Sequence, residues 1–128
     1  MVTTDQKVLV FTESSNGHFY VFSEVNGTPI KFLVDTGASD IVLSPSDAKR
    51  LGIDVRTLDF SRVYQTANGT GHGAPFTLAR LSIGSIELSD VPASINQAEM
   101  SESLLGMSFL RGMASFEIRD RRLFLRLR

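Results

Sequence analysis

Short apolar or alternating runs, separated by Gly, Asn, Pro and Asp, recur along most of this 128-residue chain. Alternation with a period of two is typical of strands that bury one face, and the intervening residues favour tight turns. The pattern therefore predicts one small all-β domain without an internal repeat. The expected strands cover residues 18–25, 30–34, 40–43, 61–66, 75–83, 85–91, 93–97, 114–118 and 123–127.

Three turns between these expected strands have a specific chemistry. Asn26-Gly27 tolerates positive φ at both central positions of a tight hairpin turn, and Asp120-Arg121 is expected to turn the closing hairpin. The glycine-rich run at residues 67–73 is expected to be a mobile hairpin tip. Antiparallel neighbours are therefore expected at all three places.

Two short helices are expected among the strands. Ser44 can cap the first helix, Pro45 suits its first position, Asp47 favours its positive end and Gly52 suits its exit. A second helical turn is expected over residues 106–111. Both helices are too short to change the all-β class.

The most informative segment is residues 32–39, Phe-Leu-Val-Asp-Thr-Gly-Ala-Ser. Asp35 follows three apolar strand residues and precedes a turn-forming pair, so its carboxylate should emerge from a buried strand into a tight loop. Such a carboxylate is a poor structural choice and a good catalytic one. Asp followed by Ser or Thr and then Gly arises by chance in about one chain in twenty of this length, usually as an ordinary turn. The apolar strands on both sides favour an active site instead.

This segment resembles the active-site loop of the retropepsin-like aspartic proteases. Leu104-Leu105-Gly106 resembles the apolar pair plus Gly that packs beneath that loop in the family, and the glycine-rich hairpin stands where the family carries its flap. Order and spacing match over residues 19–127, and the run from Leu104 is similar to single-domain cellular and bacterial members. The resemblance implies a closed acid-protease β-barrel with two short helices, one lobe per chain.

The resemblance also implies an endopeptidase that is active only as a homodimer. Two carboxylates in contact share one proton, so that one activates a water while the other polarises the scissile carbonyl. The chain contains one Asp-Thr-Gly, so each subunit would contribute Asp35 to the pair. The Thr36 hydroxyl would bond to the opposite loop. The substrate would be an extended polypeptide.

Further site residues follow from the same resemblance. Thr36, Gly37, Ala38 and Ser39 would form the active-site loop around catalytic Asp35. Residues that would contact the substrate are a flap pair and an apolar pair, Asn68, Gly69, Leu104 and Leu105. Ala38 stands where pepsin-like enzymes usually place a hydroxyl, which points to activity nearer neutral pH.

Two positions depart from the viral pattern. Viral members usually have an Asp where Ser39 stands and an Arg where Met107 stands, and these two brace the dimer. Here the brace is either replaced or the dimer is weaker.

Composition excludes several other functions. There is no cysteine and there are only two histidines, so thiolate chemistry, disulfides and a histidine zinc site are not expected, and no metal or cofactor is predicted. The net charge of −1 gives no general attraction to nucleic acid or membrane, and no apolar run is long enough to span a membrane. The compartment is undetermined; one interpretation is the soluble domain of a membrane-anchored bacterial protein.

Several alternatives stay open. The same barrel could bind peptides or dimerise without cleaving, or serve as a structural module of a larger protein. Residues 1–17 are expected to be an N-terminal extension or edge strand before a protease domain at 18–128. The tail at residues 122–128 alternates and is either a basic edge strand or a dimer-interface strand. Tyr64 is expected to be a packed strand residue rather than a flap contact.

Overall fold

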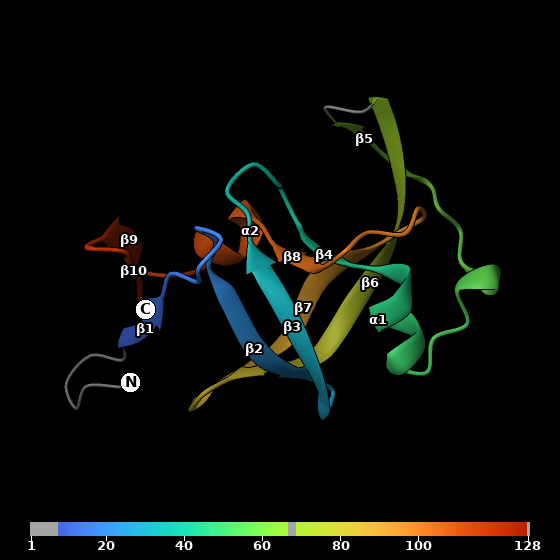
Figure 1. Ribbon diagram of the computed structural model, residues 1–128. Coiled ribbons are helices and arrows are strands. Elements are labelled where there is room, and N and C mark those ends of the chain that lie inside the picture. Colours follow the sequence, from blue (N-terminus) through green and yellow to red (C-terminus); the bar gives the residue numbers. More distant parts are fainter. Residues whose placement is uncertain (1–7, 67–68, 128) are drawn as a thin grey trace.

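The computed structural model describes residues 8–66 and 69–127, and six of its strands close into a barrel (Figure 1). Around the ring, each strand pairs with the next and the last pairs with the first; in this order the strands are β2 (Tyr20–Val25), β3 (Thr28–Val34), β8 (Ser103–Leu105), β4 (Ile41–Leu43), β7 (Ile86–Asn96) and β6 (Gly69–Ile83). The predicted all-β barrel is confirmed. Its two short α-helices, within the described part of the chain, are α1 (Pro45–Arg50) and α2 (Met107–Leu110).

Two parts of the fold extend beyond this ring. Strand β5 (Arg62–Thr66) pairs with the first residues of β6, and together they form a two-stranded arm that rises from the barrel (Figure 1). On the other side, β1 (Val8–Thr12), β10 (Arg122–Arg126) and β9 (Ser115–Arg119) form a three-stranded sheet. The predicted boundary between residues 17 and 18 stays a prediction.

Two tight hairpin turns are formed by the dipeptides that the sequence indicates. Asn26 and Gly27 have φ of 50° and 85°, and Asp120 and Arg121 have φ of 52° and 60°. Positive φ at both central positions twists the turn in the sense of the flanking strands. These turns set the register of β2 with β3 and of β9 with β10.

Helix α1 is capped as its sequence predicts, and its cap also reaches the barrel. The Ser44 Oγ accepts from the Asp47 N–H at 3.1 Å, and Pro45 opens the helix. The Ser103 hydroxyl, fully buried, donates to the Asp47 carboxylate at 2.6 Å and accepts from the Ser44 N–H at 3.0 Å. This network joins the helix start to β8. A short 3-10 turn, η1 (Val55–Thr57), follows.

The core fills the barrel with aliphatic and aromatic side chains from the inner faces of the strands. Helix α2 adds Phe109 and Leu110, and α1 adds Ala48. The largest side chains with almost no exposure are Phe32, Ile30, Ile41, Leu43, Leu78, Leu81, Ile95, Leu105, Leu110, Leu123, Leu125 and Val21. Strands β3, β4 and β8, which position the site described below, are therefore anchored in one continuous core.

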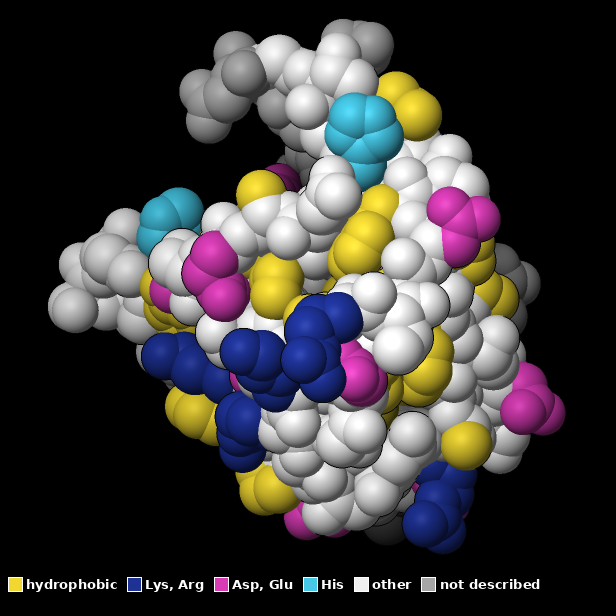
Figure 2. All heavy atoms as spheres, turned by 90° about the vertical axis from the view of Figure 1, so that its right-hand side faces the viewer, with side chains coloured by type: hydrophobic (Ala, Val, Ile, Leu, Met, Phe, Trp, Pro, Cys, Tyr) yellow, Lys and Arg dark blue, Asp and Glu magenta, His cyan; other side chains and the backbone are white. Residues whose placement is uncertain are grey.

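Charged side chains gather on the face that carries α1 and η1. Figure 2 shows Lys and Arg side chains in the middle of this face beside Asp and Glu, and a hollow that opens at its top. Arg50 lies 3.3 Å from Asp47, and Arg56 lies 3.0 Å from Asp54. The Arg56 side chain and its backbone N–H both hold the pKa of Asp54 below its usual range. Acidic neighbours thus neutralise part of the basic charge.

Two sequence predictions about strands are corrected by the structure. The two strands expected at 85–91 and 93–97 are one continuous strand, because Pro92 pairs with Thr77 on one side while β7 meets β4 only from Ser94 onward. Proline is tolerated at such an edge position. The predicted hairpin is formed by β5 and β6, but its tip is shorter than expected, because β6 begins at Gly69 and residues 69–73 pair with β5. Residues 67 and 68 of the expected tip lie outside the described residues.

The C-terminal tail also differs from its expected position. β10 is the central strand of its sheet, between β1 and β9, and not an edge strand. The alternation itself is confirmed, because Leu123 and Leu125 are fully buried. The position of β10 depends on pairing with β1, at the other end of the chain, which local alternation cannot reveal. A role of the tail in a dimer interface stays a prediction.

Leu105→Ala should lower the free energy of unfolding by about 2–5 kcal/mol, because it deletes a fully buried side chain and leaves a cavity. Val63→Ala is the matched control, since Val63 is 59% exposed, and it should change stability by no more than about 0.5 kcal/mol. Urea unfolding followed by circular dichroism measures both. Equal losses would contradict the assignment of Leu105 to the core.

Candidate active site

The loop between β3 and β4 lies over β8, which runs between these two strands. β8 is parallel to β3 and antiparallel to β4. The end of β3 and the start of β4 are thereby held on either side of Leu104 and Leu105, and Asp35 comes directly after Val34, the last residue of β3. Strand β3, whose Ile30 and Phe32 are buried in the core, therefore delivers the Asp35 carboxylate to the surface at a defined point.

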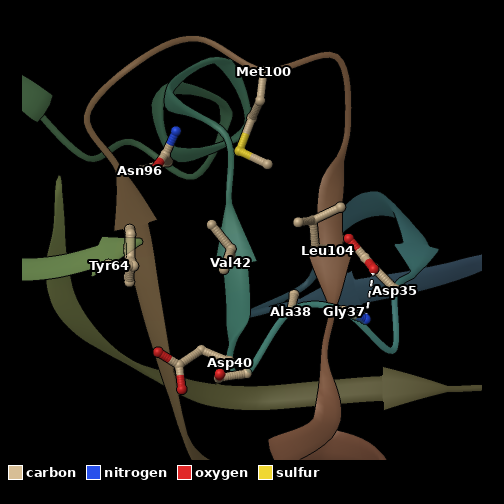
Figure 3. A pocket seen from close by; sticks show the side chains of 10 residues that line it. Asp35, Gly37, Ala38, Asp40, Val42, Tyr64, Asn96, Met100 and Leu104 are labelled. Atoms are coloured by element: carbon tan, nitrogen blue, oxygen red, sulfur yellow. Dashed lines mark hydrogen bonds between the residues drawn. The ribbon is translucent and has the colours of Figure 1, made fainter. Parts of the chain in front are cut away.

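Backbone hydrogen bonds hold Asp35 in place. Its N–H donates to the Leu105 carbonyl at 3.0 Å, and its carbonyl accepts from the Ala38 N–H at 3.2 Å. The carboxylate Oδ1 accepts from the Gly37 N–H at 2.9 Å (Figure 3). Asp35 is half-buried, and the loop thus orients it through its backbone and one carboxylate oxygen.

Gly106 lets β8 approach this loop more closely than any other residue would. A Cβ at position 106 would overlap the Asp40 carbonyl oxygen and lie 2.6 Å from the Ala38 carbonyl oxygen. Just beyond it, the N–H groups of Met107 and Ser108 donate to the carbonyls of Ala38 and Ser39, both at 2.8 Å. The resemblance implied that Leu-Leu-Gly packs beneath the Asp35 loop, and the structure places it there.

A pocket of about 580 Å³ opens beside Asp35. In the view of Figure 3, the side chains that cross the pocket are, in order from Asp35, those of Leu104, Val42 and Tyr64. Its walls are mainly apolar, with a few polar groups; the lining residues are Asp35, Gly37, Ala38, Ser39, Asp40, Val42, Tyr64, Asn96, Met100 and Leu104. The site therefore combines a positioned carboxylate with a cavity for an apolar group.

The predicted substrate-binding residues divide into three groups. Leu104 lines the pocket, whereas Leu105 is fully buried in the core and cannot line it, because neighbours on a strand point to opposite faces. Gly69 begins β6 and does not line the pocket, and Asn68 lies outside the described residues. The expectation of a leucine pair in the cleft is thus corrected to Leu104 alone.

The predicted loop residues also differ among themselves. Gly37, Ala38 and Ser39 line the pocket with Asp35, but Thr36 does not. The Thr36 side chain is exposed, and its hydroxyl makes no hydrogen bond to any residue that the structure describes. Thr36 therefore faces solvent at the outer side of the loop.

Three pocket residues that were not predicted from the sequence come from separate elements. Asp40 precedes β4, Tyr64 belongs to β5 and Asn96 ends β7. Tyr64 is a partial correction: it is packed, as expected, but it also lines the pocket. The one sequence signal for this role was that Tyr64 shares a strand face with Arg62 and precedes a glycine-rich run.

Met100, another missed residue, is carried by a loop that helix α1 anchors. The Ser46 hydroxyl donates to Glu99 Oε2 at 2.7 Å, and the Met100 N–H donates to Glu99 Oε1 at 3.2 Å. The Asn96 amide donates to the Ala98 carbonyl at 2.7 Å. These contacts fix the loop that turns Met100 toward the pocket (Figure 3).

Metal-binding and membrane-spanning features are not seen among the residues described. Within 8–66 and 69–127 there is no group of three or more His, Cys, Asp or Glu side chains that would hold a metal ion. Over the same residues, none of the helices has the length and apolar character needed to cross a membrane.

The six-stranded ring, with its Asp-Thr-Gly loop seated on a Leu-Leu-Gly strand, defines the retropepsin-like class of aspartic protease folds. Residues 21–112 match the family described as "gag-polyprotein putative aspartyl protease". The chain belongs to this retropepsin-like aspartic protease family.

Two sequence relatives illustrate its neighbourhood. Uncharacterized protein RP867 of Rickettsia prowazekii is 40% identical over 116 residues, which cover 91% of this chain and 50% of that protein. Protein DNA-DAMAGE INDUCIBLE 1 of Arabidopsis thaliana is 35% identical over 98 residues, 72% of this chain and 22% of that protein. The chain thus spans half or less of the length of these relatives.

Two solved structures with a similar fold agree with this family assignment. A retropepsin-like aspartic protease from Rickettsia conorii is 39% identical and superposes with a TM-score of 0.86, covering 98% of this chain and 94% of that one. The EIAV protease, solved with the inhibitor HBY-793, superposes with a TM-score of 0.67 at 17% identity, over 84% of this chain and 99% of that one. The second likeness concerns the fold alone.

Gly106→Ala should destabilise the protein by about 1–3 kcal/mol, because the new methyl group displaces the Asp35 loop backbone. Gly112→Ala is the comparison, since its Cβ would lie 3.2 Å from the Phe109 carbonyl oxygen and 3.9 Å from that of Ser108, and it should cost less. Urea unfolding gives the stabilities, and amide chemical shifts of residues 35–40 report the displacement. Unchanged shifts in Gly106→Ala would contradict the close approach.

Ser46→Ala should raise the pKa of Glu99, which the Ser46 hydroxyl, the Met100 N–H and the Lys49 charge hold below its usual range. Since folding depresses this pKa, the contacts stabilise the loop above the unfolded-state pKa, and the stabilisation is lost as pH falls through the folded-state pKa. Carboxyl NMR titration measures the shift. Ser101→Ala, which removes a hydroxyl bonded to Glu102 instead, should leave Glu99 unchanged.

Proposed function

We propose that this chain is an aspartic endopeptidase that hydrolyses peptide bonds in extended polypeptides. The observation that carries the proposal is the position of Asp35. Its carboxylate follows a strand that is anchored in the core by Ile30 and Phe32, and it lies in a backbone-braced loop at the mouth of a mainly apolar pocket. Membership of the retropepsin-like family supports the same function.

The chemistry requires a second carboxylate. A single exposed carboxylate ionises near pH 4 and has little reactivity, whereas two in contact share a proton and act together as base and acid. The ionised member would take a proton from the attacking water, and the protonated member would hydrogen-bond to the scissile carbonyl. No covalent intermediate is needed, so the absence of cysteine is no obstacle.

The second Asp35 would come from a second copy of this chain related by a two-fold axis. In such an isologous contact, the same loop meets its own copy. Thr36 is exposed at the outer side of the loop, and its hydroxyl is available to bond across the axis. Ser39 and Met107 carry no charge, so the ion pair of the viral members is absent at these positions.

The substrate would lie between the Asp35 loop and the arm formed by β5 and β6. An extended peptide places alternate side chains on opposite sides, so one of them would enter the pocket beside Asp35. Val42, Leu104 and Met100 would surround it with apolar surface. Apolar residues next to the scissile bond are therefore the expected preference.

Asp35→Asn should abolish cleavage of a peptide library, with a loss of at least about 10²-fold in rate, because an amide cannot act as the base. Asp59→Asn, at an exposed carboxylate outside the pocket, is the matched control and should cleave normally. Mass spectrometry identifies the products, and circular dichroism verifies folding. Cleavage by Asp35→Asn would overturn the proposal, and peptide capture without cleavage by both proteins would favour the non-catalytic binder.

Mixing wild-type protein with Asp35→Asn tests the shared site. If subunits pair at random, equal amounts leave about a quarter of the dimers with two Asp35 residues, and activity per wild-type chain falls to about half. Specific activity should also rise with protein concentration as dimers form. Activity that is independent of both the mutant chain and the concentration would show that one chain suffices.

A further inference from the structure

The inner face of the β5–β6 arm carries two described side chains, Arg62 and Tyr64. They lie two residues apart on β5 and so share one face, whereas Val63 between them points outward and is 59% exposed. The Tyr64 side chain is half-buried and lines the pocket beside Asp35. The arm thus contributes a large aromatic wall to the candidate active site.

Alternating glycines make room for this aromatic ring. In the register of β5 with β6, Gly71 lies opposite Tyr64 and Gly73 lies opposite Arg62, so these glycines share the inner face. A Cβ at Gly73 would overlap the Tyr64 hydroxyl and lie 2.7 Å from Cζ. The ring therefore leans across Gly73, and its buried hydroxyl has no hydrogen-bond partner among the residues described.

Tyr64 bounds the pocket on the side away from Asp35. Figure 3 shows Tyr64 and Leu104 on either side of Val42, with Asp35 beyond Leu104. A side chain that enters next to the carboxylate would pass Leu104 and Val42 and then meet the Tyr64 ring. The distance that it can extend is therefore set by Tyr64.

An ion pair connects strand β5, which carries Tyr64, to the loop that carries Asp35. Within the described residues, β5 pairs with β6 alone, and an isolated two-stranded arm is marginally stable in water. Arg62 Nη2 lies 2.7 Å from Asp40 Oδ2, and the two side chains are 42% and 22% exposed. Asp40 belongs to the loop whose backbone contacts Gly106. The pair thus ties the arm to the segment that carries Asp35.

We propose that Tyr64 is a specificity-determining residue that limits the size of the substrate side chain in this pocket, and that Arg62 and Asp40 position it. The inference rests on the proposed function. The substrates would be polypeptides with a medium-sized aliphatic side chain, such as Leu or Met, at the position that enters the pocket. Larger aromatic side chains would be disfavoured because they meet the Tyr64 ring.

The test uses peptides that differ at that one position, with Ala, Leu, Phe or Trp. Tyr64→Ala should raise kcat/KM for Phe and Trp relative to Leu by on the order of tenfold, because it removes the wall. Tyr64→Phe keeps the ring and should keep the wild-type preference. Val63→Ala, on the outer face of the same strand, is the matched control. If Tyr64→Ala fails to fold by circular dichroism, Tyr64→Leu replaces it, and an unchanged preference in the folded variant overturns the proposal.

The positioning pair is tested by the kinetic constants. Arg62→Gln should raise KM several-fold with little change in kcat, because the Tyr64 ring is displaced while the Asp35 carboxylate keeps its hydrogen bond from the Gly37 N–H. Arg62→Lys preserves the charge and should recover most of the wild-type KM. A fall in kcat without a rise in KM, or no recovery in Arg62→Lys, overturns the positioning role.

Binding of the same peptides to Asp35→Asn variants separates this inference from the proposed function. The size preference should appear in equilibrium affinities measured by fluorescence anisotropy, with and without Tyr64→Ala. If wild-type protein cleaves nothing but the affinity preference changes with Tyr64→Ala, the protease proposal fails and the pocket assignment holds. If cleavage depends on Asp35 but neither preference changes, the pocket assignment fails alone. If peptides are neither cleaved nor bound, both fail.

Discussion

The close contact between the backbone of β8 and that of the Asp35 loop is the constraint on which the rest of the site depends. Gly106 permits it, and the N–H groups that follow donate to the Ala38 and Ser39 carbonyls. On the other side, the Asp35 N–H donates to Leu105. Buried backbone groups that pair in this way hold a loop without side-chain packing. The carboxylate can therefore stand beside a cavity and still be oriented.

The strands that hold the Asp35 loop are more constrained than the β5–β6 arm. Strands β3, β4 and β8 are paired on both sides within a ring whose core is continuous, whereas β5 is paired on one side only. Local stability follows the number of buried contacts and backbone bonds that an opening would break. The fold thus places the reacting group on its most constrained part. The side chain that would select the substrate lies on a less constrained part, tied back through Arg62 and Asp40.

Features with a local cause were predictable. Asn26-Gly27 forms a tight turn because both residues accept positive φ, which few other dipeptides do. Ser44-Pro45 starts a helix because the capping hydrogen bond needs only atoms of neighbouring residues. The Asp35 loop was recognisable because strand, carboxylate and turn are consecutive. Errors occurred where the partner was distant. Pro92 lies within a continuous strand because its neighbour on one side is Thr77 of β6, while β4 pairs with β7 only from Ser94 onward. β10 is a central strand because β1, from the other end of the chain, pairs with it.

The sequence by itself determined the strand periodicity, the tight turns, the first helix and the identity of the candidate catalytic carboxylate, because each is written in consecutive residues. Only the tertiary structure decided which leucine of Leu104-Leu105 faces the pocket and that Tyr64, Asp40 and Asn96 join Asp35 there. These side chains come from the β3–β4 loop, β8, β7 and the β5–β6 arm. The physical reason is that a pocket is formed by strand pairing across the whole chain, and no local pattern records which strands become neighbours.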